Sequence, residues 1–428
     1  MSATELSLAS IKSKRMLYLV FATITLLVLG LIYAWSIFAS PLARDFPDYQ
    51  GLLPQVFQVS MFAFCVSALF GAQLIKKTSA KLAIIVAAVL LGAGFLLTAV
   101  GAGWSVWTLY AFYGILAGSG CGIAYNAIIS LVNPWWPDRI GFASGVQMMG
   151  FGLASLVFGT VANALFGIMP WQTVFILIAA VGMAALICLA IIVRPAPANI
   201  EQILTGAATK AGSSAPKTSA TQQQNILTTR VFWLFCVWAT ITIACGLTLI
   251  GSAKQGAEAL GVDPAFAAVL VGLVSGLNGL GRVINGAIFD KFGLVPVMVI
   301  GALFAIVTMA ALAFAFTTLT GPIYIVAAIL VAFPYSAVPV MASAYARQRY
   351  GPIGFAKNLG IANLNIASAA LLNILIAALF GPIKSPVDAG DTTIYMLLAL
   401  LAVIALVFAL LFGRAYKADL EKIRGELS

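Results

Sequence analysis

The sequence predicts an all-α integral membrane protein with twelve transmembrane helices. Of its 428 residues, 62% are hydrophobic and only 8% are charged, whereas a soluble domain carries about 25% charged residues. Several apolar runs exceed the roughly 20 residues that a helix needs to cross the hydrocarbon core of a bilayer. The first such run is Lys14–Phe38 and the last is Thr392–Gly413. The main solvent of this chain is therefore lipid.

The predicted spans form two sets of six, separated by one long polar stretch. Residues 194–229 are rich in Ala, Ser, Thr, Gln and Lys and nearly free of large apolar residues, which is typical of a flexible linker. We expect a six-helix bundle at 1–193, a cytoplasmic linker at 194–229, and a second six-helix bundle with a short cytoplasmic tail at 230–428. The predicted spans are 16–38, 54–75, 81–101, 104–132, 141–167 and 171–193, then 230–251, 264–289, 293–317, 320–345, 353–381 and 392–413.

The net charge of +10 follows from membrane topology and does not indicate a nucleic-acid partner. Nineteen of the 23 basic residues fall in segments that the alternating spans place on one side of the membrane. Lys and Arg concentrate in the cytoplasmic loops of membrane proteins, so both termini are predicted to be cytoplasmic. Three basic residues fall in the predicted outward loops, and they are Arg44, Lys254 and Lys384. The remaining cation is Arg282, which lies inside a span.

Arg282 is the sharpest functional signal in the sequence. A cation inside hydrocarbon costs at least about 2.5–3.5 kcal/mol, so such residues usually face a cavity and have a function. The planar guanidinium matches a carboxylate in shape and charge. Asn278 and Asn285 lie four residues before and three after it, hence on the same helical face. The alternative is an arginine that snorkels toward the cytoplasm, with Asp290 eight residues further on.

No acidic residue accompanies Arg282 in the predicted spans, because all 13 lie in loops, tails or span ends. An unpaired buried cation is poorly tolerated, so an anionic substrate is expected to complete the site. Tyr33, Tyr125 and Tyr335 are mid-span or nearly so, and each hydroxyl needs a partner. That partner is either the bound anion or a neighbouring backbone carbonyl. Histidine is absent, and the spans lack acid and metal ligands, so we expect no enzyme, metal site or cofactor.

Glycines at regular spacing indicate where helices approach each other closely. Small residues at such positions let two backbones meet in a membrane. The positions that we interpret in this way are Gly118, Gly120, Gly122, Gly145, Gly150 and Gly152.

Three stretches resemble the oxalate:formate antiporter family, a bacterial branch of the major facilitator superfamily close to the monocarboxylate porters. They are residues 30–38 (GLIYAWSIF), residues 109–145 with the turn WWPDR at 135–139, and residues 278–293 (NGLGR continuing to DKFG). The resemblance implies the major facilitator fold, in two halves related by an axis along the membrane normal. It also implies a multi-pass protein of the bacterial inner (cytoplasmic) membrane, which we expect to be a monomer.

In that family the arginine of span eight binds the carboxylate inside an aromatic cage. The resemblance therefore implies substrate-binding roles for Arg282, Tyr33, Tyr125 and Tyr335, with Asn278 beside the arginine and Gln55 as a further candidate. The oxalate carrier has a second cation, a lysine in span eleven, where this sequence has Ile366. One cation suits one negative charge, so we expect a monocarboxylate such as formate, lactate or pyruvate.

Whether transport is coupled to protons is predicted from the titratable groups that the spans lack. Proton-coupled monocarboxylate porters carry an Asp where Asn278 stands, so anion exchange or uniport is favoured over proton symport. Two alternatives stay open, a proton-coupled symporter and a carboxylate sensor built on a transporter fold. Such sensors usually add a long cytoplasmic extension, whereas the tail after Gly413 has 15 residues.

Overall fold

The computed structural model describes residues 3–136, 140–197, 200, 204, 224–381 and 389–427. Every regular element within these ranges is helical. Twelve helical segments in this part of the chain are long and apolar enough to cross a membrane. The predicted all-α transmembrane fold with twelve spans is therefore confirmed.

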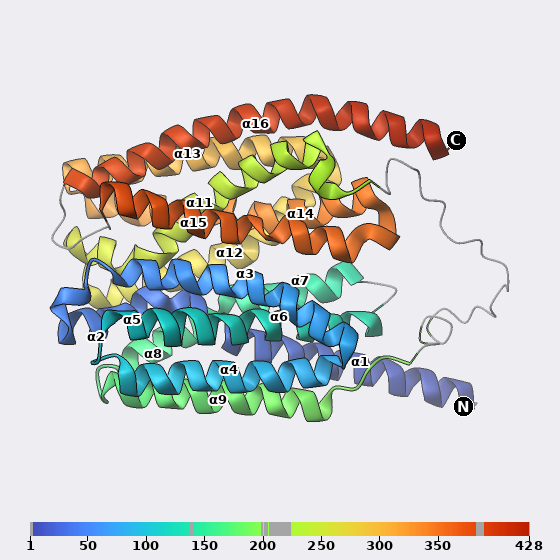
Figure 1. The fold of residues 1–428 in the computed structure, drawn as a ribbon, viewed down its shortest axis with the longest axis horizontal. Helices are drawn as coiled ribbons and strands as arrows, with labels where there is room; N and C mark the ends of the chain where they lie inside the picture. Colours follow the sequence, from blue (N-terminus) through green and yellow to red (C-terminus); the bar gives the residue numbers. More distant parts are fainter. Residues whose placement is uncertain are drawn as a thin grey trace.

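The helices form two groups that follow each other in the chain, and Figure 1 shows the first group below the second. The first group consists of α1 (Ala3–Leu29), η1 (Gly30–Ala34), α2 (Trp35–Asp45), η2 (Pro47–Tyr49), α3 (Leu53–Lys77), α4 (Ala80–Gly101), α5 (Val106–Leu109), η3 (Tyr110–Ala117), α6 (Gly118–Val132), η4 (Asn133–Trp135), α7 (Ile140–Ala154), η5 (Ser155–Gly159), α8 (Thr160–Leu165) and α9 (Trp171–Ile192). The second group, preceded by the short turn η6 (Ile226–Thr228), consists of α11 (Arg230–Ala259), α12 (Pro264–Phe292), α13 (Leu294–Thr318), α14 (Gly321–Asn363), α15 (Asn365–Phe380) and α16 (Ala389–Leu427).

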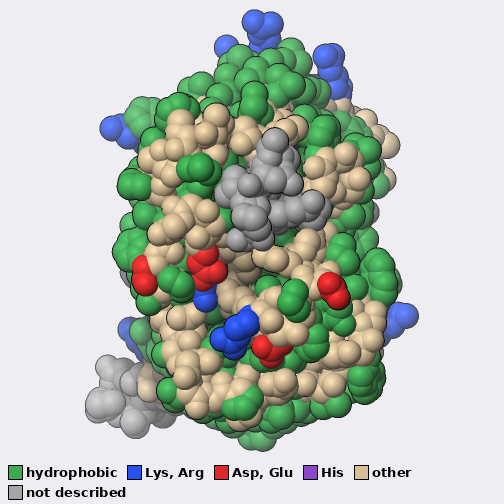
Figure 2. Space-filling view, turned by 90° about the vertical axis from the view of Figure 1, so that its left-hand side faces the viewer, with side chains coloured by type: hydrophobic (Ala, Val, Ile, Leu, Met, Phe, Trp, Pro, Cys, Tyr) green, Lys and Arg blue, Asp and Glu red, His purple; other side chains and the backbone are tan. Residues whose placement is uncertain are grey.

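Both termini lie at one end of the molecule, on the right in Figure 1. We call the opposite end the distal end; it contains the last turns of α2, α8 and α11 and the first turns of α3 and α12. Figure 2 views this end and shows basic and acidic side chains near its middle.

Helix α11 is longer than predicted. The sequence predicts a span that ends at 251, because polar residues follow, but the helix continues to Ala259. Lys254 is only 6% exposed. Our placement of Lys254 in an outward loop was therefore wrong. Lys254 and Gln255 in this last part do not end the helix, because they bond to Asn163 and Ser36 of the other group.

Two further helices also extend past their predicted ends. Helix α14 continues from Gly321 to Asn363 through the predicted turn after 345, and α16 continues to Leu427, well past 413. The start of α12 agrees with the prediction. Asp263 caps this helix, since its Oδ1 accepts the backbone N–H groups of Ala265 and Phe266 at 2.9 and 3.1 Å.

Most of the glycines singled out in the sequence lie where helices meet. A Cβ atom on Gly118, Gly120, Gly122 or Gly150 would lie 2.0–2.7 Å from a backbone atom of a neighbouring helix, and one on Gly152 would lie 3.1 Å from the Cα of Gly279. Our prediction of close packing is confirmed for these five. It is wrong for Gly145, where nothing lies within 4 Å.

Replacing Gly122 with Ala should lower the thermal stability of the purified protein. The new methyl carbon would lie 2.0 Å from the carbonyl oxygen of Phe64, so α6 and α3 must move apart, which typically costs about 1–3 kcal/mol. Gly286→Ala, on α12 where nothing lies within 4 Å, is the matched control. Thermal unfolding in detergent checks this. Equal melting temperatures for the two variants and the parent chain would contradict it.

Candidate functional site

Arg282 lies on α12 and reaches across to the first group of helices. Its Nη1 donates a hydrogen bond to the backbone carbonyl of Met148 on α7, at 3.2 Å. Its Nε is buried and has no hydrogen-bond partner among the described residues. The side chain therefore points between the two groups of helices and does not snorkel toward lipid headgroups. An arginine with an unused donor in such a place is suited to bind an anion.

Three tyrosines from three different segments surround this arginine. Tyr33 comes from η1, Tyr125 from α6 and Tyr335 from α14. The Arg282 guanidinium lies close enough to interact electrostatically with all three hydroxyl groups, and Tyr125 is within hydrogen-bonding reach of it. The hydroxyl oxygens of Tyr33 and Tyr335 lie 3.0 Å apart and share a hydrogen bond across the two groups. The structure thus brings together the four residues that the sequence predicts for one site.

Phenylalanines complete an aromatic cage around the tyrosines. The ring of Phe151, on α7, lies 5.3 Å from that of Tyr33 and 5.1 Å from that of Tyr125, edge to face in both cases. Phe64, on α3, lies 5.5 Å from Tyr125 and 5.9 Å from Phe151. The cage excludes water on several sides, and a charge interaction is stronger where water is excluded. Sequence reasoning missed these phenylalanines because nothing distinguishes them from ordinary core residues.

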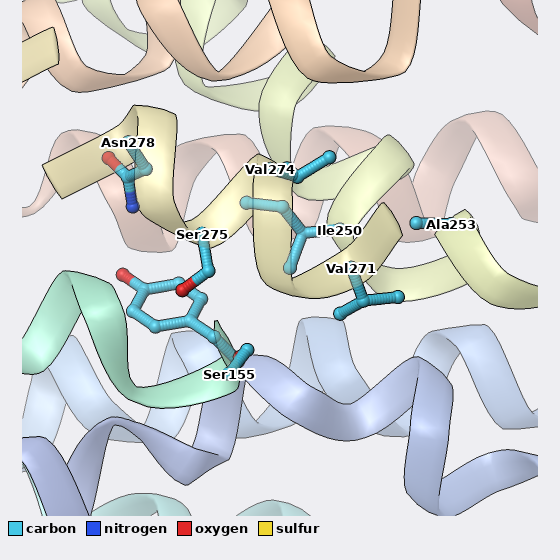
Figure 3. Close-up of a pocket in the computed structure, with 8 residues that line it drawn as sticks. Ser155, Ile250, Ala253, Val271, Val274, Ser275 and Asn278 are labelled. Atoms are coloured by element: carbon cyan, nitrogen blue, oxygen red, sulfur yellow. The ribbon is translucent and has the colours of Figure 1, made fainter. Parts of the chain in front are cut away.

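Asn278 lies one helical turn from Arg282 and lines a small pocket between the two groups of helices, to which Tyr33 also contributes. Figure 3 shows Asn278 and Ser275 from α12 facing Ser155 from η5, with aliphatic side chains on the other side. The Oδ1 of Asn278 and the Oγ of Ser155 are buried without a partner among the described residues. The pocket thus offers unused polar groups beside an apolar wall.

The position of Ser155 depends on local helix geometry. The five residues of η5 form a π-helical turn between α7 and α8. Such turns are often found at functional sites, because the extra residue redirects the side chains of the helix. Ser275 donates a hydrogen bond to the backbone carbonyl of Gly152, the last turn before this segment. The polar end of the pocket is therefore built by contacts between α7, η5 and α12.

Two polar residues that the sequence analysis named lie outside the aromatic cage. Gln55 lines a separate pocket with Gln58, Thr248 and Asn373, near the distal end. Asn285 faces α14, where its Nδ2 donates to the backbone carbonyl of Phe333 and to Ser336 Oγ at 3.2 and 3.1 Å. The structure therefore does not bring Gln55 next to Arg282, and it gives Asn285 a role in helix packing.

The second cation of the oxalate carrier has no counterpart in α15. Ile366 is partly buried and packs against the hydrophobic core. None of the described carboxylates lies within ion-pair distance of Arg282, since the ion pairs found there join Arg44 to Asp45, Lys254 to Glu258, and Arg349 to Asp419. Arg282 is thus the one cation of the cage within the described part of the chain.

Comparison with known proteins places this architecture among transporters. A family model described as Major Facilitator Superfamily matches residues 20–372. The MFS-type transporter YhjX of Escherichia coli (strain K12) is 26% identical over 83% of this chain and 86% of that protein. The oxalate:formate antiporter of Oxalobacter formigenes is 24% identical over 79% of this chain and 80% of its own length.

More distant similarities agree with this result. Monocarboxylate transporter 13 of Bos taurus is 22% identical over 40% of this chain and 39% of that protein. Among solved structures, a D-xylose-proton symporter superposes with a TM-score of 0.70 at 18% identity, covering 91% of this chain and 96% of the other. At that identity the superposition supports a similarity of fold only.

Proposed function

This chain belongs to the Major Facilitator Superfamily, and from that premise we propose that it carries a small monocarboxylate across the membrane by alternating access. Arg282 carries the proposal. Its guanidinium lies between the two groups of helices, its Nε is buried and without a described partner, and three tyrosine hydroxyls surround it. A carboxylate would neutralise this cation and accept hydrogen bonds from it and from the tyrosines.

One negative charge fits this site better than two. Ile366 supplies no charge in α15, and Lys254, another buried cation, has Asn163 and Glu258 as its partners and no residue of the cage. A dianion at Arg282 would leave one carboxylate without a cation in a poorly hydrated site, which is costly. The names of two relatives, an oxalate:formate antiporter and a monocarboxylate transporter, support a carboxylate as the class of substrate.

Transport requires the two bundles, residues 1–193 and 230–428, to rock around the site. Three contacts now join them near Arg282: the Tyr33–Tyr335 hydrogen bond, the Ser275 bond to Gly152, and the Arg282 bond to Met148. A bound carboxylate can replace hydrogen bonds of this kind as the bundles move. The basic residues near the termini favour a cytoplasmic position for both termini, so the distal end faces outward across a bacterial inner membrane.

The residues that line the site favour anion exchange or uniport over proton symport. Asn278 occupies the place of the proton-carrying Asp of related porters, and its amide does not titrate. A proton-coupled symporter remains the second candidate, because one described carboxylate, Glu258, lies within α11.

Formate, lactate and pyruvate should bind at least about tenfold more tightly than oxalate or malonate, which corresponds to about 1.4 kcal/mol. The measurement is inhibition of labelled monocarboxylate uptake in proteoliposomes, with the shift in melting temperature of the purified protein as an independent readout. A neutral panel of sugars and amides is the control. Tightest binding by oxalate would overturn the one-cation argument.

Ile366→Lys tests the same idea by adding the missing charge. The variant should gain affinity for dicarboxylates while keeping monocarboxylate binding within the same range, because the new ammonium can pair with the second carboxylate. Ile366→Met, which has a similar length and no charge, is the matched control. Equal gains in the two variants would show that shape and not charge was responsible.

A further inference from the structure

Lys254 forms a contact across the two groups of helices that the sequence does not reveal. Its Nζ donates a hydrogen bond to Oδ1 of Asn163 on α8, at 2.9 Å. The same Nζ lies 3.7 Å from Oε1 of Glu258, one turn further along α11. The lysine side chain is 7% exposed, whereas that of Glu258 is 30% exposed. A lysine this deeply buried is unusual unless it is paired or functional.

The residues next to Lys254 close the distal side of the Arg282 region. Gln255 donates from Nε2 to the backbone carbonyl of Ser36 on α2, at 2.9 Å. Ala253 lines the pocket that also contains Asn278. A Cβ on Gly251 would lie 3.1 Å from the ring of Phe57 on α3. The end of α11 therefore contacts α2, α3 and, through Asn163, α8 of the first group.

The partners of Lys254 leave it able to bind an anion. An ammonium group has three N–H donors, and Asn163 takes one of them with a neutral amide oxygen. The distance to Glu258 exceeds the 2.7–2.9 Å of a charge-assisted hydrogen bond. Arg44, whose side chain is 74% exposed, is close enough to Lys254 to interact with it electrostatically, and its neighbour Asp45 accepts from the indole N–H of Trp171. Neither contacts Nζ of Lys254 in the described structure.

We propose that Lys254 is a second carboxylate-binding group, located at an entrance for substrate at the distal end. While this entrance is closed, the amide oxygen of Asn163 occupies the position next to Nζ that the carboxylate takes when it is open. The proposal rests on the proposed function. Opening of the distal side moves α8 away from α11, so Lys254 loses the amide oxygen of Asn163. An incoming carboxylate replaces that oxygen before it reaches Arg282. Glu258 stays with Lys254 because both lie on the same helix.

Two substitutions should change the affinity for lactate that enters from the distal end, and they should change it in opposite directions. In right-side-out vesicles, Lys254→Gln should raise the half-saturating concentration of lactate about tenfold, since a hydrogen bond from a charged group is lost. Asn163→Ala should lower it, because the competing amide is gone. A lysine needed only for packing would not give this opposite response. In inside-out vesicles both values should stay near those of the parent chain.

Matched variants separate a specific site from general attraction. Arg44→Gln removes a positive charge at the same end and should leave the half-saturating concentration unchanged. Lys254→Arg keeps the charge and should retain most of the affinity. If Lys254→Gln is not recovered as folded protein, Asn163→Ala still decides, because a raised distal half-saturating concentration in that variant contradicts the proposal.

The rate of cysteine labelling, measured without substrate, tests whether the bond between Lys254 and Asn163 keeps the distal end closed. Ser36→Cys, in a chain whose exposed Cys188 is replaced by Ala, should react slowly with a membrane-impermeant maleimide because Ser36 is fully buried. Adding Asn163→Ala should speed the reaction. An unchanged rate, or an unchanged distal affinity of Lys254→Gln in a chain that transports lactate, overturns the entrance site alone. Absence of any carboxylate flux in the parent chain overturns the proposed function instead.

Discussion

Replacing Arg282 with Ala is expected to reduce carboxylate transport at least about a hundredfold, because each hydrogen bond from a charged donor contributes about 1.5–3 kcal/mol. The variant removes the cation of the aromatic cage. The three tyrosine hydroxyls remain as hydrogen-bond donors, but no positive charge is left to bind the carboxylate. Arg282→Gln should behave in the same way. Arg282→Lys should recover little activity, since a point charge cannot reproduce the planar fork of the guanidinium.

The effect of this substitution on folding should be small. The side chain donates a hydrogen bond to the backbone carbonyl of Met148 and lies within hydrogen-bonding reach of Tyr125, and its removal also removes the cost of a buried cation without an ionic partner. Thermal unfolding in detergent and the yield of inserted protein measure this. Arg230→Ala, an exposed arginine at the start of α11, is the matched control and should transport normally. Near-normal uptake by Arg282→Ala would move the substrate site elsewhere.

An inward proton gradient should not drive accumulation of the carboxylate above its equilibrium level. The groups of the cage that can exchange a proton are tyrosines, whose pKa is ordinarily near 10, and Cys65 and Cys121 nearby, ordinarily near 8.5. Groups with such pKa values are mostly protonated at pH 7, and arginine does not release its own proton. Uptake should therefore depend on an exchangeable anion inside the vesicle, or it should simply equilibrate.

Proteoliposomes loaded with a carboxylate or left empty measure this directly. Labelled substrate should enter loaded vesicles faster, and a protonophore should leave the plateau unchanged. Protein-free liposomes give the leakage of the undissociated acid. Concentrative uptake that requires the proton gradient and collapses with a protonophore would contradict the prediction. Glu258→Gln then shows whether Glu258 carries the proton, because only a coupling residue would lose concentrative uptake and keep exchange.

The residues of the cage could be predicted because each violates a rule for lipid. A cation and mid-span tyrosines in apolar helices require partners, and Arg282, Tyr33, Tyr125 and Tyr335 indeed lie together. Phe64 and Phe151 could not be singled out, since aromatic rings in apolar runs are common. Gln55 was placed with the cage by resemblance, but it lines another pocket.

The sequence alone determined the number of spans and showed that Arg282 is a cation within a span and not in a loop. Both follow from the cost of placing charge and unsatisfied backbone in hydrocarbon, which acts locally and is visible in the order of residues. Only the tertiary structure decided whether Lys254 is exposed to water or buried against another helix. A helix that ends in Ser252, Lys254, Gln255 and Glu258 looks like a span giving way to a loop. Whether these side chains meet water or another helix depends on partners such as Asn163 and Ser36, which lie 91 and 219 positions away in the chain. Burial and bonding to such distant partners keep the helix intact to Ala259.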